Sequence, residues 1–190
     1  MATIIKYTNE LQNEISSAQL SSLNRYVRQV YTDQHLDKEE FFVNGELSST
    51  LYYVDSLSKT NKILEVDPNA SFKYKYFQDD FTVYFHLNYK FEILVGKTVY
   101  VRDINDNTIC YLNYNLPANT PIYESTEKYY YDAEGELKYR FHYASSGICV
   151  MIYDEQQDQA DIFPQTIGQP GRFFTWQGFE YYQFAYPLVP

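Results

Sequence analysis

Cysteine is scarce in this chain: only Cys110 and Cys149 occur among its 190 residues. The two lie far apart, and neither belongs to a Cys-x-x-Cys pair, which excludes a zinc knuckle and a disulfide framework. We therefore expect two reduced, buried thiols.

Long apolar runs are also missing. No uninterrupted apolar stretch approaches the roughly 18 residues that span a bilayer. The N-terminus turns polar directly after Ile4 and Ile5, which is not the pattern of a signal peptide. The sequence thus predicts a cytosolic (cytoplasmic) protein with no targeting signal and no membrane partner.

Positive charge is in short supply. Fifteen Lys and Arg stand against 25 Asp and Glu, for a net charge of −10. Such a field repels the phosphates of nucleic acids and anionic membrane surfaces, whereas it attracts a basic protein. We expect no nucleic-acid partner, and a basic protein partner fits the charge best.

Motifs that carry chemistry are missing as well. The chain has no G-x-S-x-G elbow, no H-E-x-x-H and no phosphate-binding glycine loop. His35, His86 and His142 share no metal-ligand spacing. Residues 103–107 begin like a calcium loop, but Thr108 replaces the required glycine, which favours a hairpin turn. We expect no metal and no cofactor. No motif supports an enzyme, but the sequence leaves open whether two carboxylates converge in a catalytic cleft.

Tyrosine is the compositional surplus, with 22 copies beside 13 Phe and one Trp. Aromatic residues favour pleated, half-buried surfaces and thus predict strands. The Tyr rings can pack across a sheet with their hydroxyls in water, or they can form a contact surface, because Tyr is enriched at interfaces.

The N-terminal region carries a helical pattern. Leu11, Ile15, Leu20 and Leu23 recur at the spacing of an amphipathic helix, which we predict over about residues 10–24. Residues 26–31 alternate well enough to be either a first strand or a last helical turn.

The central region has the signature of strands. Asn44-Gly45 separates two β-prone runs, and this pair is a strong signal for a type I′ hairpin. In residues 81–89, apolar and polar side chains alternate, so that Phe81, Val83, Phe85 and Leu87 face the core.

These patterns predict a predominantly antiparallel α+β protein formed by a single domain over 1–190. The N-terminal helix precedes a β-meander over about 39–153, and an aromatic, irregular tail packs on the sheet over 162–190. The meander forms a single twisted or meandering sheet, with a sandwich or a partly open barrel as alternatives.

Two hairpins share a frame. Gly45-Glu46-Leu47 and Gly135-Glu136-Leu137 are each followed, at matching positions, by an apolar residue and a Tyr. This frame resembles the MORN-like repeats of bacterial proteins such as the YwqK-type antitoxin family. The resemblance implies hairpins stacked into an extended sheet and a role in toxin neutralisation.

An acidic segment and the aromatic tail supply the candidate contact residues. Residues 154–161 hold four acids and no base, and carboxylates there could meet Arg and Lys of a partner. The candidates are Asp154, Glu155, Asp158, Asp161, Trp176, Tyr181 and Tyr182.

The leading hypothesis is an immunity or antitoxin protein that binds a toxin domain directly. A carbohydrate-binding or glycan-hydrolysing β domain is one alternative, because exposed Tyr and Trp176 can stack on sugars. A structural assembly module is another.

Overall fold

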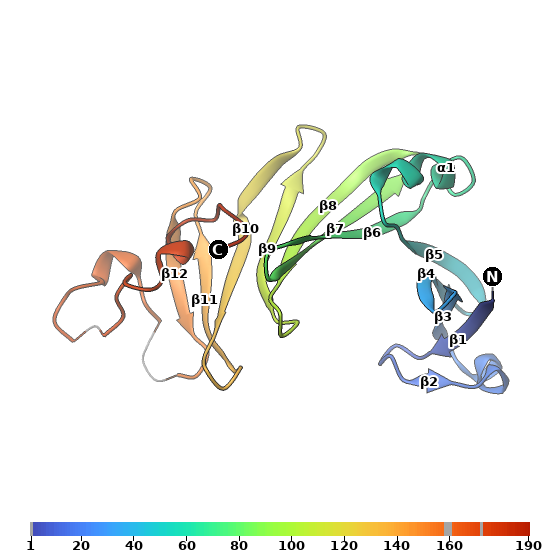
Figure 1. Ribbon diagram of the computed structural model, residues 1–190, viewed down its shortest axis with the longest axis horizontal. Coiled ribbons are helices and arrows are strands. Elements are labelled where there is room, and N and C mark those ends of the chain that lie inside the picture. Colours follow the sequence, from blue (N-terminus) through green and yellow to red (C-terminus); the bar gives the residue numbers. More distant parts are fainter. Residues whose placement is uncertain (1, 158–160, 172) are drawn as a thin grey trace. The chain divides into compact units, whose positions relative to one another are not determined.

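The computed structural model describes residues 2–157, 161–171 and 173–190. Its described residues form one open, mostly antiparallel sheet with the strand order β12-β11-β10-β9-β8-β7-β6-β5-β4-β3-β1-β2 (Figure 1). The predicted β-rich α+β class with a single sheet is confirmed. None of the described helices has the length and apolar character needed to cross a membrane.

The strands are β1 (Thr3–Thr8), β2 (Glu14–Ile15), β3 (Arg25–Thr32), β4 (His35–Val43), β5 (Glu46–Tyr53), β6 (Ser71–Gln78), β7 (Phe81–Lys90), β8 (Ile93–Arg102), β9 (Thr108–Asn115), β10 (Thr120–Tyr131), β11 (Leu137–Tyr143) and β12 (Cys149–Asp154). The helical segments among the described residues are short: α1 (Thr60–Leu64) and four 3₁₀ turns, η1 (Ser17–Ser22), η2 (Leu57–Lys59), η3 (Pro164–Thr166) and η4 (Glu180–Gln183).

Contacts divide the chain into two compact units. Unit 1 comprises residues 1–75 and 85–96, and unit 2 comprises residues 76–84 and 97–190. Each unit has its own core. The expectation of a single domain stays a prediction.

The N-terminal region differs from the predicted amphipathic helix over about 10–24. It forms the two-residue strand β2 and the 3₁₀ turn η1, which buries none of its residues, and Leu11 is 79% exposed. The helical spacing fails because Glu14 and Ile15, within the predicted helix, pair with Thr8 and Tyr7 of β1 as the strand β2. Residues 25–32 then form β3, where Val27 pairs with Thr8 of β1 and Phe41 of β4. The strand interpretation of residues 26–31 is confirmed, and the sheet begins at β1 rather than near residue 39.

The hairpin predicted at Asn44-Gly45 is confirmed. Val43 pairs with Glu46, and the two turn residues have φ angles of 51° and 81°. These values belong to the left-handed region that a type I′ turn requires. Gly135, in the turn between β10 and β11, has a φ of 84°. Both glycines of the shared frame therefore adopt the left-handed backbone conformation.

The core of unit 1 lies around Phe72. Phe72 and Ala70 are fully buried, and Leu64 of α1 and Leu87 of β7 are buried beside them. The alternation predicted in β7 therefore holds for Leu87. In the part of β7 that belongs to unit 2, Val83 is buried at 1% exposure, whereas Phe81 is only partly buried.

Strand β4 of unit 1 buries two neighbouring carboxylates, each with its own partners. Glu40 is 4% exposed and pairs with Arg28 and, at 2.6 Å, with Lys38 Nζ. Glu39 accepts hydrogen bonds from Gln29 Nε2 at 2.9 Å and from the Tyr53 hydroxyl at 2.8 Å. Buried charges persist when they are paired or hydrogen-bonded in this way.

The core of unit 2 is built by the C-terminal segment on one side of β10, β11 and β12 (Figure 1). Phe141, Ile152 and Ile162 are fully buried, and Phe174 is 4% exposed. The ring of Tyr182 stacks on Phe141 with 4.4 Å between the ring centres. The tail thus packs on the sheet, as the sequence predicts.

Lys128 of β10 ties the C-terminal segment to this core. Its side chain is fully buried, and Nζ donates to the backbone carbonyls of Tyr181, Phe184 and Pro187 at 2.9, 2.9 and 2.7 Å. The ammonium also lies 3.5 Å from the centre of the Tyr181 ring. Burial lowers the pKa of Lys128 to about 8.

Both thiols are free and buried, as predicted. Burial raises the pKa of Cys110 to about 11 and that of Cys149 to about 12. Neither sulfur therefore has thiolate character at neutral pH.

Candidate functional site

One side of the unit 2 sheet carries a row of aromatic and charged side chains. Residues paired across neighbouring strands share a face, and the pairing joins Tyr100, Tyr111, Glu127, His142 and Met151 into one row. A second row joins Tyr129, Arg140 and Tyr153. We call these eight residues the open face.

Period-two alternation in β10 and β11 separates the open face from the core. Lys128 pairs with Phe141 on the core side, whereas Glu127 pairs with His142 and Tyr129 with Arg140 on the open side. The side chains of Glu127, Arg140 and His142 are 28%, 33% and 29% exposed. The open face is thus half-buried among its own neighbours and accessible to water.

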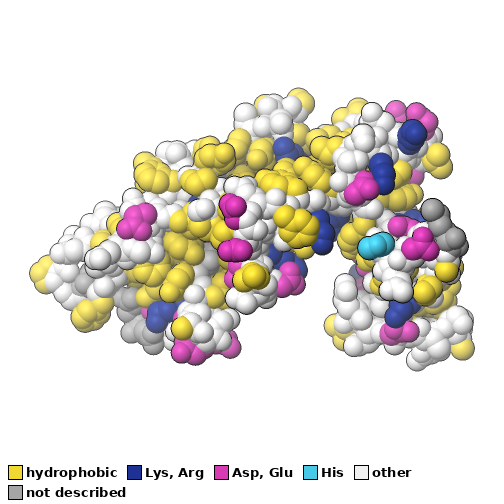
Figure 2. Space-filling view, viewed as in Figure 1, with side chains coloured by type: hydrophobic (Ala, Val, Ile, Leu, Met, Phe, Trp, Pro, Cys, Tyr) yellow, Lys and Arg dark blue, Asp and Glu magenta, His cyan; other side chains and the backbone are white. Residues whose placement is uncertain are grey.

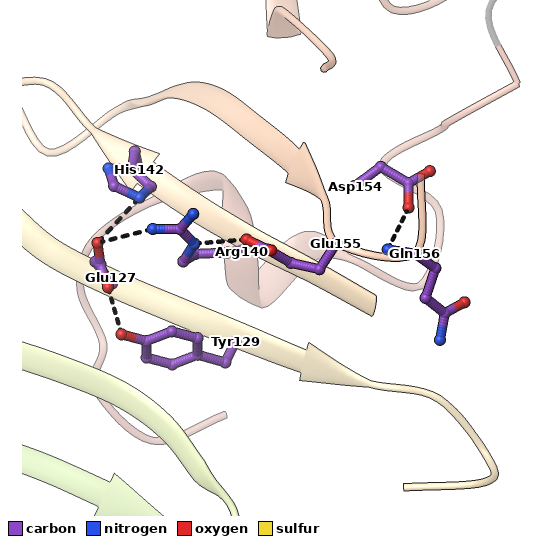
Figure 3. A network of polar contacts seen from close by, with 7 residues as sticks. All are labelled: Glu127, Tyr129, Arg140, His142, Asp154, Glu155 and Gln156. Carbon is purple, nitrogen blue, oxygen red and sulfur yellow. Dashed lines mark hydrogen bonds and ion pairs between the residues drawn. The ribbon is translucent and has the colours of Figure 1, made fainter. Parts of the chain in front are cut away.

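A network of polar contacts organises its centre, with Glu127 in the middle (Figure 3). The Tyr129 hydroxyl donates to Glu127. His142 Nε2 lies 3.0 Å and Arg140 Nη1 3.6 Å from Glu127 Oε1. On its other side, Arg140 Nε donates to Glu155 at 2.7 Å. The carboxylates and guanidinium hold one another in place.

The His142 contact is close but poorly aligned. His142 Nε2 is buried and makes no hydrogen bond of good geometry to any described residue, although Glu127 Oε1 is only 3.0 Å away. Burial lowers the pKa of His142, and the nearby Glu127 carboxylate opposes this only in part. His142 is therefore neutral at physiological pH.

The tyrosine in the network is held in its protonated form. Burial raises the pKa of Tyr129 well above its usual value, and the hydrogen bond to Glu127 adds to the rise. A phenol that serves as a fixed donor is a poor nucleophile or base. The network is suited to presenting a rigid polar surface rather than to proton transfer.

Two arginines of unit 2 lie between a tyrosine ring and a carboxylate. The Arg140 guanidinium is 4.7 Å from the centre of the Tyr153 ring while it pairs with Glu155. Arg102 lies 5.6 Å from the Tyr84 ring and 5.7 Å from the Tyr100 ring. Arg102 Nη1 also donates to Asp106 at 2.7 Å. These distances are those of cation–π contacts.

One end of the unit 2 sheet is strongly acidic. The turn 103–107, the turn 132–136 and the segment 154–157 lie at the same end, because β9 starts beside the end of β10 and β12 ends beside the start of β11. Their acids are Asp103, Asp106, Asp132, Glu134, Glu136, Asp154 and Glu155. Figure 2 shows acidic side chains over the turn between β10 and β11. We call this group the acidic end.

The turns at the opposite end carry no acid at all. Residues 116–119 are Leu, Pro, Ala and Asn, and residues 144–147 are Ala, Ser, Ser and Gly. Unit 2 as a whole contains six Lys and Arg against fourteen Asp and Glu, so it holds −8 of the net charge of −10. The negative field is therefore concentrated in one unit and, within it, at one end.

The acidic candidates predicted from the sequence fall into three classes. Asp154 is only 5% exposed, and its carboxylate accepts a hydrogen bond from the Gln156 backbone at 3.2 Å. Glu155 pairs with Arg140, and Asp161 is exposed. Asp158 lies outside the described residues. The structure thus places Glu155 beside Arg140 of the open face and buries Asp154.

The aromatic candidates lie in the core of unit 2. Trp176 packs edge-on against Phe174 at 5.3 Å, and Tyr181 lies under the Lys128 ammonium. The Tyr182 hydroxyl donates to the Tyr129 carbonyl at 3.4 Å. These three rings hold the C-terminal segment on the sheet.

Sequence reasoning missed the residues at the centre of the open face, Glu127, Arg140 and His142. A signal was present, since Arg140 and His142 alternate with Tyr139, Phe141 and Tyr143 along β11. Polar residues at every second position of an aromatic strand indicate a face that remains wet.

No group of three or more His, Cys, Asp and Glu side chains is arranged to hold a metal ion in the part of the chain that the structure describes. Comparison with protein-family models, with curated proteins and with solved structures found no match to this chain.

Proposed function

We propose that this protein is a small acidic binding protein, an immunity or antitoxin protein that neutralises a cognate basic toxin by direct contact. The observation that carries the proposal is the concentration of charge, because unit 2 holds −8 of the net −10. A concentrated field raises the association rate with a partner of opposite charge.

The tyrosines of the open face support the same proposal. Tyr combines a large contact area with few rotatable bonds and is enriched at protein interfaces. Tyr111, in the first row between Tyr100 and Glu127, is 37% exposed. The sheet of successive hairpins also agrees with the architecture that the resemblance to MORN-like repeat antitoxins implies.

The carbohydrate alternative loses its main support. Trp176, the side chain that would stack on a sugar, packs against Phe141 and Phe174 instead. We therefore do not propose a carbohydrate-binding function.

The proposal is tested by co-expression with the product of the neighbouring gene in the source genome. We expect a complex that survives size-exclusion chromatography at low salt, weakens as salt rises, and relieves the growth defect caused by the neighbour alone. A neighbour that stays toxic and elutes separately even at low salt would contradict the proposal.

A further inference from the structure

We propose that the open face and the acidic end together form a docking surface for an arginine-bearing segment of a basic protein. This inference rests on the proposed function and deepens it, because it names the binding surface and the partner side chain, arginine, that the surface recognises.

The first argument is charge. An exposed cationic segment that approaches unit 2 meets the acidic end, where Glu134 and Glu136 are exposed in the turn that leads into β11. The turns at the other end of the same sheet offer no carboxylate. The field thus orients the segment along the strands as well as attracting it.

The second argument is how this surface already holds guanidinium groups. Arg140 lies over the Tyr153 ring and pairs with Glu155, and Arg102 lies near the Tyr84 and Tyr100 rings and pairs with Asp106. Both arginines use the same combination of aromatic ring and carboxylate. A guanidinium prefers this combination because its plane stacks on a ring while its edge donates to oxygen.

The third argument is rigidity. Glu127 is contacted by Tyr129, Arg140 and His142, and the opposite side of the same strands is packed against the C-terminal segment. A preorganised surface loses little side-chain entropy on binding. A lysine of the partner would fit this surface less well than an arginine, since an ammonium is a strongly hydrated point charge that stacks poorly on a ring.

The surface is tested with two synthetic probes of equal charge, octa-arginine and octa-lysine, each acetylated, amidated and fluorescently labelled. Anisotropy titrations at low salt measure both affinities for the whole protein. We expect octa-arginine to bind about threefold more tightly than octa-lysine, the gain of an exposed cation–π contact. Amide shifts in ¹⁵N spectra should map to β9–β12 and the acidic end.

Matched variants separate this surface from general electrostatics. Glu134→Lys with Glu136→Lys reverses two charges at the acidic end and should weaken octa-arginine binding about tenfold. Glu46→Lys with Glu65→Lys makes the same change in net charge in unit 1, at residues that are also exposed, and should weaken binding by about twofold or less.

Two Tyr→Ser variants test whether the aromatic rings of the open face give the preference for arginine. Tyr111→Ser removes the most exposed ring of the first row and should abolish the preference for octa-arginine over octa-lysine. Tyr186→Ser removes a ring that is 65% exposed in the C-terminal segment and should leave the preference intact. Equal effects of the two charge variants, shifts confined to unit 1, or no preference for arginine would each overturn the inference.

Failure of this inference is distinguishable from failure of the proposed function. If the neighbouring gene product binds the Glu134→Lys, Glu136→Lys variant as tightly as the wild type, the docking surface is wrong and the function stands. If no neighbour binds but octa-arginine shows the expected preference and map, the surface stands and the function is wrong.

Discussion

Replacing Lys128 with Met tests whether a buried ammonium holds the C-terminal segment of unit 2 in place. Methionine fills a similar volume but cannot donate to the carbonyls of Tyr181, Phe184 and Pro187. A hydrogen bond from a charged donor contributes about 2 kcal/mol, so the three together contribute about 6 kcal/mol.

Removing the charge also recovers part of this loss. The fall in the pKa of Lys128 from 10.5 to about 8 corresponds to about 3 kcal/mol. We therefore expect Lys128→Met to lower the free energy of unfolding by about 3 kcal/mol at neutral pH.

The pH dependence gives a sharper test. Between about pH 8 and 10.5 the unfolded chain still holds the proton that the folded Lys128 has released, so wild-type stability gains from rising pH in this window. The variant lacks this gain. The thiols of Cys110 and Cys149 and the Tyr181 phenol, which surround Lys128, titrate in both proteins. The difference in stability should therefore widen by up to about 3 kcal/mol between pH 8 and 10.5.

Urea unfolding followed by tryptophan fluorescence suits this test, because Trp176 is the single tryptophan and lies in the core of unit 2. Lys62→Met, at an exposed lysine of α1, is the control and should change stability little. A Lys128→Met protein with unchanged stability, or a difference that stays constant from pH 8 to 10.5, would refute the reasoning.

Three further predictions follow from burial and backbone geometry. Cys110 and Cys149 should resist a thiol reagent in the native protein and react together in denaturant, because burial raises their pKa values to about 11 and about 12; rapid native labelling would contradict this. Glu40→Gln should cost about 3 kcal/mol in urea unfolding. Burial alone would raise the pKa of Glu40, but Arg28 and Lys38 outweigh it and lower the pKa below 4.5. The wild type should therefore lose part of its advantage over Glu40→Gln as the pH falls below about 4.5, and a constant advantage would argue against the ion pairs. Gly135→Ala should cost about 1 kcal/mol and lower Tm by about 3 °C, because an added Cβ meets no atom and only the φ of 84° is strained; an unchanged Tm would show that the turn tolerates a side chain.

Local signals predicted the sheet well where they demand one backbone conformation. Asn44-Gly45 specifies its hairpin because both residues accept a positive φ, and the Gly/Pro-rich aromatic tail could bury its rings only by packing on the sheet. The N-terminal helix was mispredicted for a nonlocal reason. Glu14 and Ile15, within the predicted helix, pair with Thr8 and Tyr7 of β1, and this pairing overrides the helical spacing.

The site was harder to predict because tyrosine suits either face of a strand. Composition could not distinguish Tyr139 of β11, which is 8% exposed in the core, from Tyr153 of the neighbouring strand β12, which lies on the open face. The tail aromatics Trp176, Tyr181 and Tyr182 were chosen as contacts, yet they complete the core. Of the acidic candidates, Glu155 pairs with Arg140 of the open face, whereas Asp154 is only 5% exposed.

The position of Lys128 also matters while the chain is being made. The carbonyls that it meets lie 53, 56 and 59 residues later in the sequence, so at roughly 5–20 residues per second they appear about 3 to 12 seconds after Lys128 does. Once Phe141 and Ile152 have been made, and until the C-terminal segment follows, these two side chains have no cover from that segment, and Lys128, which pairs with Phe141, is hydrated and charged. A cation flanking an exposed aromatic strand opposes aggregation. Lys128, which holds the C-terminal segment on the finished core, thus also opposes aggregation of the core residues before that segment has been made.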